Sequence, residues 1–392
     1  MEAIYILSAK RTPMAGLQGA LSSYTAADLG AHAIEAALQS AKLKKVVPQE
    51  VIMGCVLTAG QGQAPARQAI LKANLPQHVG ATTINKMCGS GMKAVMLAHD
   101  LIQAGTNELM VAGGMESMSN APYLLKKARS GYRLGHGELF DHMFLDGLED
   151  AYEQGNLMGI FAERCAAKYA FTRESQDAFA MRSLQRAQEA DEKGYFKKEI
   201  SPIDYQVKNE TYTLDYDETP RKVNADKIPK LRPAFSQDGT VTAANASSIS
   251  DGAAALVLAG ESYVKKHKLK PIAKITGHSS FAHAPDWFTT APIHAIEKLL
   301  KKVGWHIGQV DLFEINEAFA VVTLAAMAAL SIPHEKTNIF GGACALGHPI
   351  GASGARIIVT LINALQQTKG KKGLASLCIG GGEATAIAIE LC

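Results

Sequence analysis

The sequence contains the same pattern twice, and this repetition constrains the fold more than any other feature. In each copy an expected strand leads into a glycine-rich turn, an apolar helix, a second strand and a second glycine-rich turn. The copies span residues 83–114 and 338–382. Repetition of this kind predicts two core halves related by pseudo-symmetry, with the turns that carry Cys88 and His348 facing one interface.

Strand and helix signals alternate along both halves. In the first half we expect strands at 3–7, 50–57, 82–87 and 108–112 and helices at 26–38, 65–73 and 92–104. In the second half strand and helix are expected in turn at 272–276, 291–303, 311–314, 317–330, 338–340, 354–366, 373–378 and 383–391. Such alternation is typical of crossover units on a largely parallel sheet, so the predicted fold class is α/β.

The segment between the two halves has a different composition. Residues 115–248 hold most of the mixed-charge helices and turn-rich polar stretches, which suit a surface insertion better than a core. At roughly 100–200 residues per domain, a chain of 392 residues is expected to form two or three domains. We therefore divide it into a first core half, 1–118 plus 249–270, an inserted loop domain, 119–248, and a second core half, 271–392.

Overall composition narrows the functional class. The chain is 47% apolar and carries 40 Lys and Arg against 37 Asp and Glu, which argues against a disordered or strongly nucleic-acid-binding protein. The longest apolar run, 318–330, is shorter than the roughly 20 residues that cross a bilayer. Glu2 precedes the first basic residues, unlike the order in a secretory signal. We expect no membrane association and a cytoplasmic location.

The cysteines form no C-x-x-C pair and no zinc-like cluster, so we expect reduced thiols and no metal. Cys88 differs from the others because it lies in a strand-to-helix turn, directly before Gly89, Ser90 and Gly91. The positive end of the helix dipole favours a thiolate there, and the glycines let a ligand approach. A buried structural cysteine is the alternative, but the turn favours a nucleophile.

His348 lies between Gly347 and Pro349 in the second glycine-rich turn. A rigid turn is not the usual place for a core histidine. A neutral imidazole in it suits either removal of a thiol proton or hydrogen bonding to an oxyanion. A loop that binds only an anion is the alternative.

Two further positions suggest chemistry. Cys378 ends an expected strand before Gly380, and a second thiol at such a place suggests acid/base work. The backbone N–H groups of Gly380 and Cys88 suit a thioester oxygen. Asn316 is either the N-cap of the helix 317–330 or a functional amide.

Together these residues resemble the thiolase family. The matching blocks, in chain order, are 11–13, 85–91, 112–118, 230–235, 239–252, 316–320, 341–356 and 378–383. The resemblance covers nearly the whole chain. It implies a thiolase-like fold, in which two pseudo-symmetric five-layered α-β-α-β-α core halves carry an inserted loop domain.

The resemblance also implies an activity and a set of roles. The activity is acetyl-CoA C-acetyltransferase, the reversible ping-pong condensation of two acetyl-CoA to acetoacetyl-CoA and CoA. Cys88 would accept the acyl group, His348 would activate it, and Cys378 would remove and return the α-proton. Asn316 would hold a water that completes one oxyanion hole with His348, and the N–H groups of Cys88 and Gly380 would form the other.

The inserted domain would then hold coenzyme A thioesters, with no other cofactor. Residues 221–232 carry five basic side chains against one Asp, a local charge of +4. A solvated charge run is the plain interpretation, but a nucleotide phosphate explains it here. By family position Arg221 would contact the phosphate or adenine, and Ser247 and Ala243 would lie along the pantetheine. The acyl and pantetheine tunnel would be lined by Leu157, Met158, Phe235, Ala318 and Phe319.

One departure from the family concerns chain length. Many short-chain members have His immediately before the Met-Gly that corresponds to Met158 and Gly159, whereas this chain has Leu157. Leu157 leaves room for a somewhat longer or branched acyl group. One alternative is a longer-chain 3-ketoacyl-CoA thiolase of fatty-acid β-oxidation, and another, from a different class, is a non-catalytic CoA or acyl-lipid binding protein. Residues 124–138 resemble the family's tetramerisation loop, which implies a homotetramer.

Overall fold

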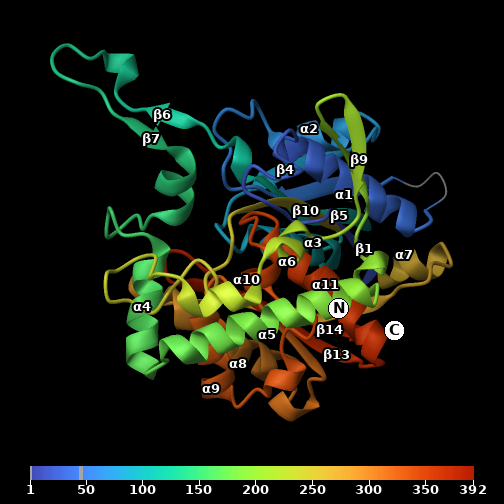
Figure 1. Cartoon of the computed structure of the whole chain (residues 1–392). Helices are drawn as coiled ribbons and strands as arrows, with labels where there is room; N and C mark the ends of the chain where they lie inside the picture. Colours follow the sequence, from blue (N-terminus) through green and yellow to red (C-terminus); the bar gives the residue numbers. More distant parts are fainter. Residues whose placement is uncertain (1, 44–46) are drawn as a thin grey trace.

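The computed structural model describes residues 2–43 and 47–392, and its centre is a continuous ten-stranded sheet (Figure 1). The first half of the chain contributes β1 (Ile4–Arg11), β2 (Ala15–Gly16), β3 (Glu50–Gly54), β4 (Gly80–Ile84), β5 (Leu109–Ser117) and β10 (Ser250–Gly260). The second half contributes β11 (Ala273–Ala282), β12 (Leu312–Ile315), β13 (Lys372–Ile379) and β14 (Glu383–Leu391).

The strand order repeats between the two halves. Along the sheet the order is β12-β13-β14-β11-β1-β10-β5-β3-β4, with β2 beside β10. In this order β1, β10, β5 and β3 correspond to β11, β14, β13 and β12. The two halves join where Ile4 of β1 pairs with Ile275 of β11. The predicted pseudo-symmetry is confirmed, and the two half-sheets are continuous across this junction.

The expectation of a largely parallel sheet is wrong. Parallel pairing occurs between β3 and β4, β3 and β5, and β12 and β13. The pairs β1–β10, β10–β5, β1–β11, β11–β14 and β13–β14 are antiparallel. The last strand of each half, β10 or β14, lies between two earlier strands of that half and runs antiparallel to both. For the same reason residues 383–391 form β14, where continued alternation predicts a helix.

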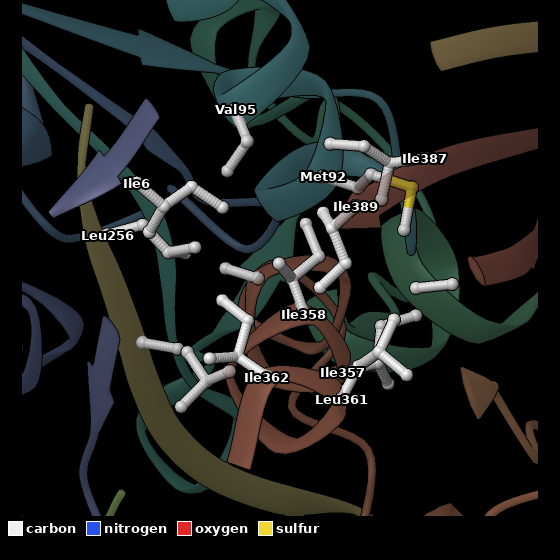
Figure 2. Close-up of a cluster of buried hydrophobic side chains, with 14 of the residues drawn as sticks. Ile6, Met92, Val95, Leu256, Ile357, Ile358, Leu361, Ile362, Ile387 and Ile389 are labelled. Carbon is white, nitrogen blue, oxygen red and sulfur yellow. The ribbon is translucent and has the colours of Figure 1, made fainter. Parts of the chain in front are cut away.

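Helices complete five layers. On the outer face of the first half-sheet lie α1 (Ala26–Ser40) and α2 (Pro65–Lys72), and on that of the second lie α8 (Ala291–Val303) and α9 (Ala320–Leu330). Between the half-sheets lie α3 (Ser90–Gln103) and α11 (Ser353–Thr368). Figure 2 shows Ile358 of α11 among Met92 of α3, Leu256 of β10 and Ile389 of β14. The five-layered α-β-α-β-α arrangement is therefore confirmed.

Two local predictions that involve asparagines in the second half are wrong. Helix α9 begins at Ala320 with Phe319 as its N-cap, so Asn316 is not the N-cap. Residues 338–340 form a turn, and the expected strand is reduced to one parallel bridge between Thr337 and Phe313. Asn338 has a positive φ of 47°, and its side chain bonds both the N–H and the C=O of Ile315.

The segment between the halves carries its own elements. These are β6 (Tyr123–Leu125), β7 (Leu139–Asp141), α4 (Met158–Tyr169), α5 (Arg173–Glu192), β8 (Ile203–Val207), β9 (Glu210–Leu214) and α6 (Glu218–Lys222). The β6–β7 hairpin projects away from the body, and α5 crosses the second half (Figure 1). The short helices α7 (Glu261–Lys266) and α10 (Ala343–Leu346) complete the chain. The boundaries proposed at 118, 248 and 270 remain predictions.

A buried ion-pair network ties the inserted segment to the first strand. The guanidinium of Arg11 bonds Glu199 at 2.6 Å and Asp217 at 2.6 and 2.8 Å. All three side chains are buried. Among the described residues, no helix has both the length and the apolar character that a bilayer crossing requires.

Candidate active site

One cavity of about 370 Å³ lies where the turns before α3 and α11 meet the end of β13. It collects most of the side chains that the sequence singled out. The predicted residues that line it are Cys88, Leu157, Met158, Phe235, Ala243, Ser247, Ala318, Phe319, His348, Cys378 and Gly380. Asn316 lies behind this wall, and Arg221 lies elsewhere.

The turn that presents Cys88 is tight and strained. Met87, directly before it, has a positive φ of 46°, a conformation that costs about 1 kcal/mol or more for a residue with a side chain. Asn85 Oδ1 accepts a hydrogen bond from Met87 N–H at 2.9 Å, and Ser90 Oγ accepts one from Lys86 N–H at 2.8 Å. These bonds hold the turn so that Cys88 lines the cavity at the start of α3, as predicted.

The Cys88 thiol is neutral at rest. Burial raises the pKa of Cys88 to about 11, although the backbone N–H groups of Gly380 and Cys88, which point at the sulfur, lower it in part. The expected gain from the helix dipole is therefore outweighed by loss of water. A nucleophile in this state needs a base during attack. The same two N–H groups are the predicted donors to a thioester oxygen.

His348 is buried and held on one side. Its ring Nδ1 lies 2.6 Å from Ser353 Oγ, and its backbone N–H donates to the carbonyl of Ser248 at 3.0 Å. Its Nε2 is buried and has no partner among the described residues. Burial, and then the positive charge of Arg356, lowers the pKa of His348 to about 3. The imidazole is therefore neutral at physiological pH and available as a base.

Asn316 belongs to the site and not to a helix start. Its Nδ2 lies 3.5 Å from His348 Nδ1, and its Oδ1 is buried without a partner among the described residues. Its backbone N–H donates to the carbonyl of Ser376 on the adjoining strand at 3.0 Å. Of the two alternatives left open by the sequence, the N-cap is excluded and the functional amide remains a prediction.

Cys378 lies at the end of β13 and is buried. Burial, and then the neighbouring Cys88 thiol, raises the pKa of Cys378 well above its usual value. The chain turns back after it through Gly381 and Gly382, both with positive φ. A Cβ on Gly382 would lie 2.5 Å from the carbonyl oxygen of His283, so the turn requires glycine. The thiols of Cys88 and Cys378 therefore come from different halves of the chain and lie close enough for one to influence the pKa of the other.

The other predicted residues form a narrow apolar wall. Ser247 N–H donates to the carbonyl of Ala318 at 2.9 Å, which joins the segment before β10 to the segment before α9. The rings of Phe235 and Phe319 meet edge to face at 5.9 Å. A Cβ on Gly159 would come within 2.3 Å of the Phe235 ring. The wall suits a slender, mostly apolar chain.

Arg221 does not join the other predicted residues. Its guanidinium bonds Asp191 at the end of α5 at 2.6 and 3.1 Å and lies 3.5 Å over the ring of Tyr216. It lines a different cavity of about 540 Å³, with Lys197 among its neighbours. The basic side chain is thus held by an acidic partner that the sequence pattern did not indicate. Its assignment as the phosphate or adenine contact remains a prediction.

Several residues that line the cavity are not among those predicted from the sequence. Phe144, Gly147 and Leu148 come from the segment after β7, and Phe288 and Ile350 come from the second half. They are ordinary apolar residues, and no sequence signal distinguishes them from core positions.

Glu116 is also absent from the predicted site residues, although a charged residue within an apolar strand is an unusual feature of the sequence. It is buried, and its carboxylate accepts backbone hydrogen bonds from Val56, Leu57 and Gly351 at 2.9, 3.1 and 2.8 Å. Burial raises its pKa to about 7, with these hydrogen bonds opposing the shift. Glu116 thereby ties the His348 turn to the first half.

Two family models match this chain, "Thiolase, N-terminal domain" over residues 4–262 and "Thiolase, C-terminal domain" over residues 269–391. Acetyl-CoA acetyltransferase IB of Candida tropicalis is 50% identical over 394 residues, covering 99% of this chain and 97% of that protein. Acetyl-CoA acetyltransferase 2 of Arabidopsis thaliana is 50% identical over 391 residues, covering 99% and 97%.

Solved structures agree with this result. The Acat5 thiolase from Ascaris suum in complex with coenzyme A superposes with a TM-score of 0.94 at 43% identity, covering all of both chains. The Bacillus anthracis acetyl-CoA acetyltransferase superposes with a TM-score of 0.97 at 41% identity, covering 100% of this chain and 99% of that one.

Proposed function

The chain belongs to the thiolase family, and on that premise we propose that it is an acetyl-CoA C-acetyltransferase. It condenses two acetyl-CoA to acetoacetyl-CoA and CoA, and it catalyses the reverse thiolysis. One observation carries this function: a thiol, an imidazole and a second thiol, those of Cys88, His348 and Cys378, come from two turns and a strand end and line one cavity. The substrates are CoA thioesters, and the proposed chemistry uses no resident cofactor.

The first half-reaction transfers an acetyl group to Cys88. His348 takes the thiol proton as the sulfur attacks the thioester carbonyl, because neither group is ionised at rest. The oxygen gains negative charge in front of the N–H groups of Cys88 and Gly380. Collapse of this intermediate breaks the bond to CoA, whose sulfur leaves with the proton of Cys378. The products are acetyl-Cys88, a Cys378 thiolate and an imidazolium at His348.

The second half-reaction forms the carbon–carbon bond. The Cys378 thiolate removes an α-proton from the second acetyl-CoA, and the enolate oxygen is stabilised by His348 and by a water held on Asn316. The enolate carbon attacks the acetyl group on Cys88 and expels the Cys88 sulfur. That sulfur recovers its proton from His348. Every residue then returns to its starting state, and the same steps in reverse order give thiolysis.

The enzyme interpretation is tested by labelling Cys88. Brief incubation with acetyl-CoA should add one acetyl group per chain, located on Cys88 by peptide mass spectrometry. Iodoacetamide should abolish thiolysis, and acetyl-CoA should protect against it. A non-catalytic CoA or acyl-lipid binder would bind acetyl-CoA without acetylation, and alkylation of Cys88 would leave its function intact.

The acetyl specificity is tested by a chain-length profile. Phe144, Leu148 and Leu157 line the cavity with apolar side chains, which is compatible with a short acyl group. Thiolysis of acetoacetyl-CoA should proceed with a higher kcat/KM than thiolysis of medium- and long-chain 3-ketoacyl-CoA. A strong preference for the longer substrates would assign the chain to fatty-acid β-oxidation instead, with the same chemistry.

We further propose that the chain assembles as a homotetramer, a dimer of dimers, through the β6–β7 hairpin. The hairpin exposes apolar side chains that a lone protein surface rarely presents together, including Leu134 at 97%, Leu139 at 67% and Tyr123 at 66% exposure. Light scattering after gel filtration should give the mass of four chains. Leu134→Asp should reduce it to two, while Leu71→Asp, at an exposed position on α2, should not.

A further inference from the structure

A second group of chemistry-bearing side chains lies away from the active cavity. His99 and Asp100 are on α3, nine and ten residues after Ser90, which places them about 14 Å or more from its start at about 1.5 Å per residue. His278 is on β11, in the other half of the chain. No step of the thiolase chemistry uses these residues.

The three side chains converge on one point. Asp100 Oδ1 lies 3.0 Å from His99 Nδ1 and 2.8 Å from His278 Nε2. The ligand atoms of all three lie within 4.8 Å of one another, and within the described residues no other group of His, Cys, Asp or Glu does so. The two imidazoles meet edge to face at 4.9 Å. Both are buried, whereas the side chain of Asp100 is 51% exposed, so solvent reaches the group from one side.

The group offers two imidazoles and one carboxylate, which ligate a metal ion in their neutral and charged forms respectively. Lys302 contributes an opposing positive charge, although its Nζ is bound to the carbonyl of His278 at 3.0 Å.

We propose that His99, Asp100 and His278 bind a divalent transition metal ion of the zinc class, with solvent as the fourth ligand. Two imidazoles, one carboxylate and an open position form a known ligand set for such ions. Each imidazole nitrogen must move away from Asp100 Oδ1 to about 3.3 Å, the spacing around an ion with bonds of about 2.0–2.1 Å. The ion replaces two N–H···O hydrogen bonds, and each imidazole moves its proton to its other ring nitrogen. A bound ion links α3 of the first half to β11 of the second.

The test uses the full-length enzyme, stripped with a chelator and alkylated with iodoacetamide so that the active-site thiols do not collect metal. Co²⁺ should add one equivalent per chain, with the visible bands of a four-coordinate ion and no thiolate charge-transfer band. Zn²⁺ should displace it and raise Tm. His278→Gln and Asp100→Asn should weaken binding by more than the roughly 10–100-fold that loss of an outer-sphere partner costs. The control His294→Gln, which removes a half-exposed imidazole on α8, should bind as the wild type does.

Thiolysis activity separates this proposal from the previous one. Without alkylation, His278→Gln and Asp100→Asn should keep the wild-type rate, since neither residue touches the active cavity. Absence of stoichiometric Co²⁺ binding in the wild type would overturn the metal site and leave the thiolase assignment intact. Equal binding by the wild type, His278→Gln and Asp100→Asn would overturn it as well, because the ion would then lie elsewhere.

Discussion

The two central helices begin in the same way, although they belong to different halves of the chain. Helix α3 starts with Ser90 and Gly91, and α11 starts with Ser353 and Gly354. Both serines are fully buried. A Cβ on Gly91 would lie 2.8 Å from the backbone nitrogen of Ala355, and a Cβ on Gly354 would lie 2.4 Å from that of Met92. Each glycine therefore lets the other helix approach, and the scaffold repeats at its centre.

The turns before these helices differ. Cys88 lies two residues before Ser90 in a strained turn that opens to the cavity, whereas His348 lies five residues before Ser353 and is buried. The strands that follow differ too, because β5 continues to Glu116 and beyond, while β13 ends at Cys378 and a glycine turn. In the proposed reaction, one half supplies the nucleophile and the other supplies the base and the proton shuttle. The proposed catalytic residues therefore lie where the two halves differ, on helices and strands that the two halves share.

Replacing the two thiols should have the largest effects on activity and should distinguish the catalytic roles of the two halves. Cys88→Ala should abolish acetyl transfer, with thiolysis falling by on the order of 10⁴-fold or more. Cys378→Ala should abolish condensation to a similar degree but still permit acetylation of Cys88. The measurements are steady-state thiolysis, mass spectrometry of the acetyl-enzyme, and exchange of the acetyl-CoA α-protons with deuterated solvent.

The exposed terminal thiol provides the control, since Cys392→Ala should retain wild-type rates. Normal α-proton exchange in Cys378→Ala would contradict the division of labour between the halves.

Replacing the base of the second turn should have the next largest effect. His348→Asn keeps a polar side chain of limited size but removes the proton acceptor for Cys88. Loss of a positioned general base typically costs about 10²–10⁴-fold. Both acetylation of Cys88 and condensation should slow, because His348 acts in both half-reactions. A defect confined to one half-reaction, measured by rapid quench, would show that the second turn does not serve both.

The same substitution should change how stability depends on pH. The unfolded imidazole gains its proton as pH falls through about 6.5, whereas His348 in the folded chain stays neutral down to a pKa of about 3. The unfolded state therefore binds more protons in this window, and stability is lost as pH falls from about 6.5 toward 3. His348→Asn should lose less stability than the wild type between pH 7 and pH 5, measured by urea unfolding. An equal loss in both proteins would mean that the folded imidazole titrates normally.

The contact between the helix starts should be sensitive to a single methyl group. Gly354→Ala places Cβ against backbone that has little room to move, and such overpacking costs about 1–3 kcal/mol or more. Gly91→Ala should cost a similar amount if the two halves are equivalent here. The control Gly308→Ala adds its Cβ where no atom lies within 4 Å and should change stability by less than about 0.5 kcal/mol. Unfolding free energies from urea titration compare the three variants, and tolerance of both Gly354→Ala and Gly91→Ala would break the proposed equivalence.

The sequence predicted the repeated scaffold well because its signals are local. Apolar periodicity located α3 and α11, and glycine clusters located the segments that carry Cys88, His348 and Cys378. Each of these features depends on residues close together in the chain. The antiparallel strands β10 and β14 depend on pairing between distant segments, and neither was predicted as a strand.

The site was predicted less completely for the same reason. The partner of Arg221 is Asp191, 30 residues earlier on another helix, and nothing near Arg221 in the chain indicates it. Phe144 and Leu148 reach the cavity only because the inserted segment folds back over it. Glu116 binds Gly351 across 235 positions. Contacts of this kind are set by packing between elements, which a single sequence does not encode in any one pattern.

The smallest expected effect concerns the two serines that begin the central helices. Ser90 Oγ accepts from Lys86 N–H at 2.8 Å and bonds the carbonyl of Met87 at 2.7 Å, so it holds only backbone. Ser353 Oγ bonds the carbonyl of Pro349 at 2.9 Å and also lies 2.6 Å from His348 Nδ1. Equivalent positions thus support a turn in one half and orient a base in the other. Ser353 is therefore a positioning residue.

Ser90→Ala and Ser353→Ala should each cost about 1 kcal/mol of stability, the net worth of a typical hydrogen bond. Only Ser353→Ala should also lower kcat beyond that structural cost, by about 3–10-fold with KM unchanged, because the His348 ring loses the partner that fixes it. Ser353→Thr, which keeps the hydroxyl, should recover most of the rate. If Ser90→Ala and Ser353→Ala lowered kcat equally, the serines would serve the scaffold alone, and the asymmetry between the halves would lie entirely in Cys88, His348 and Cys378.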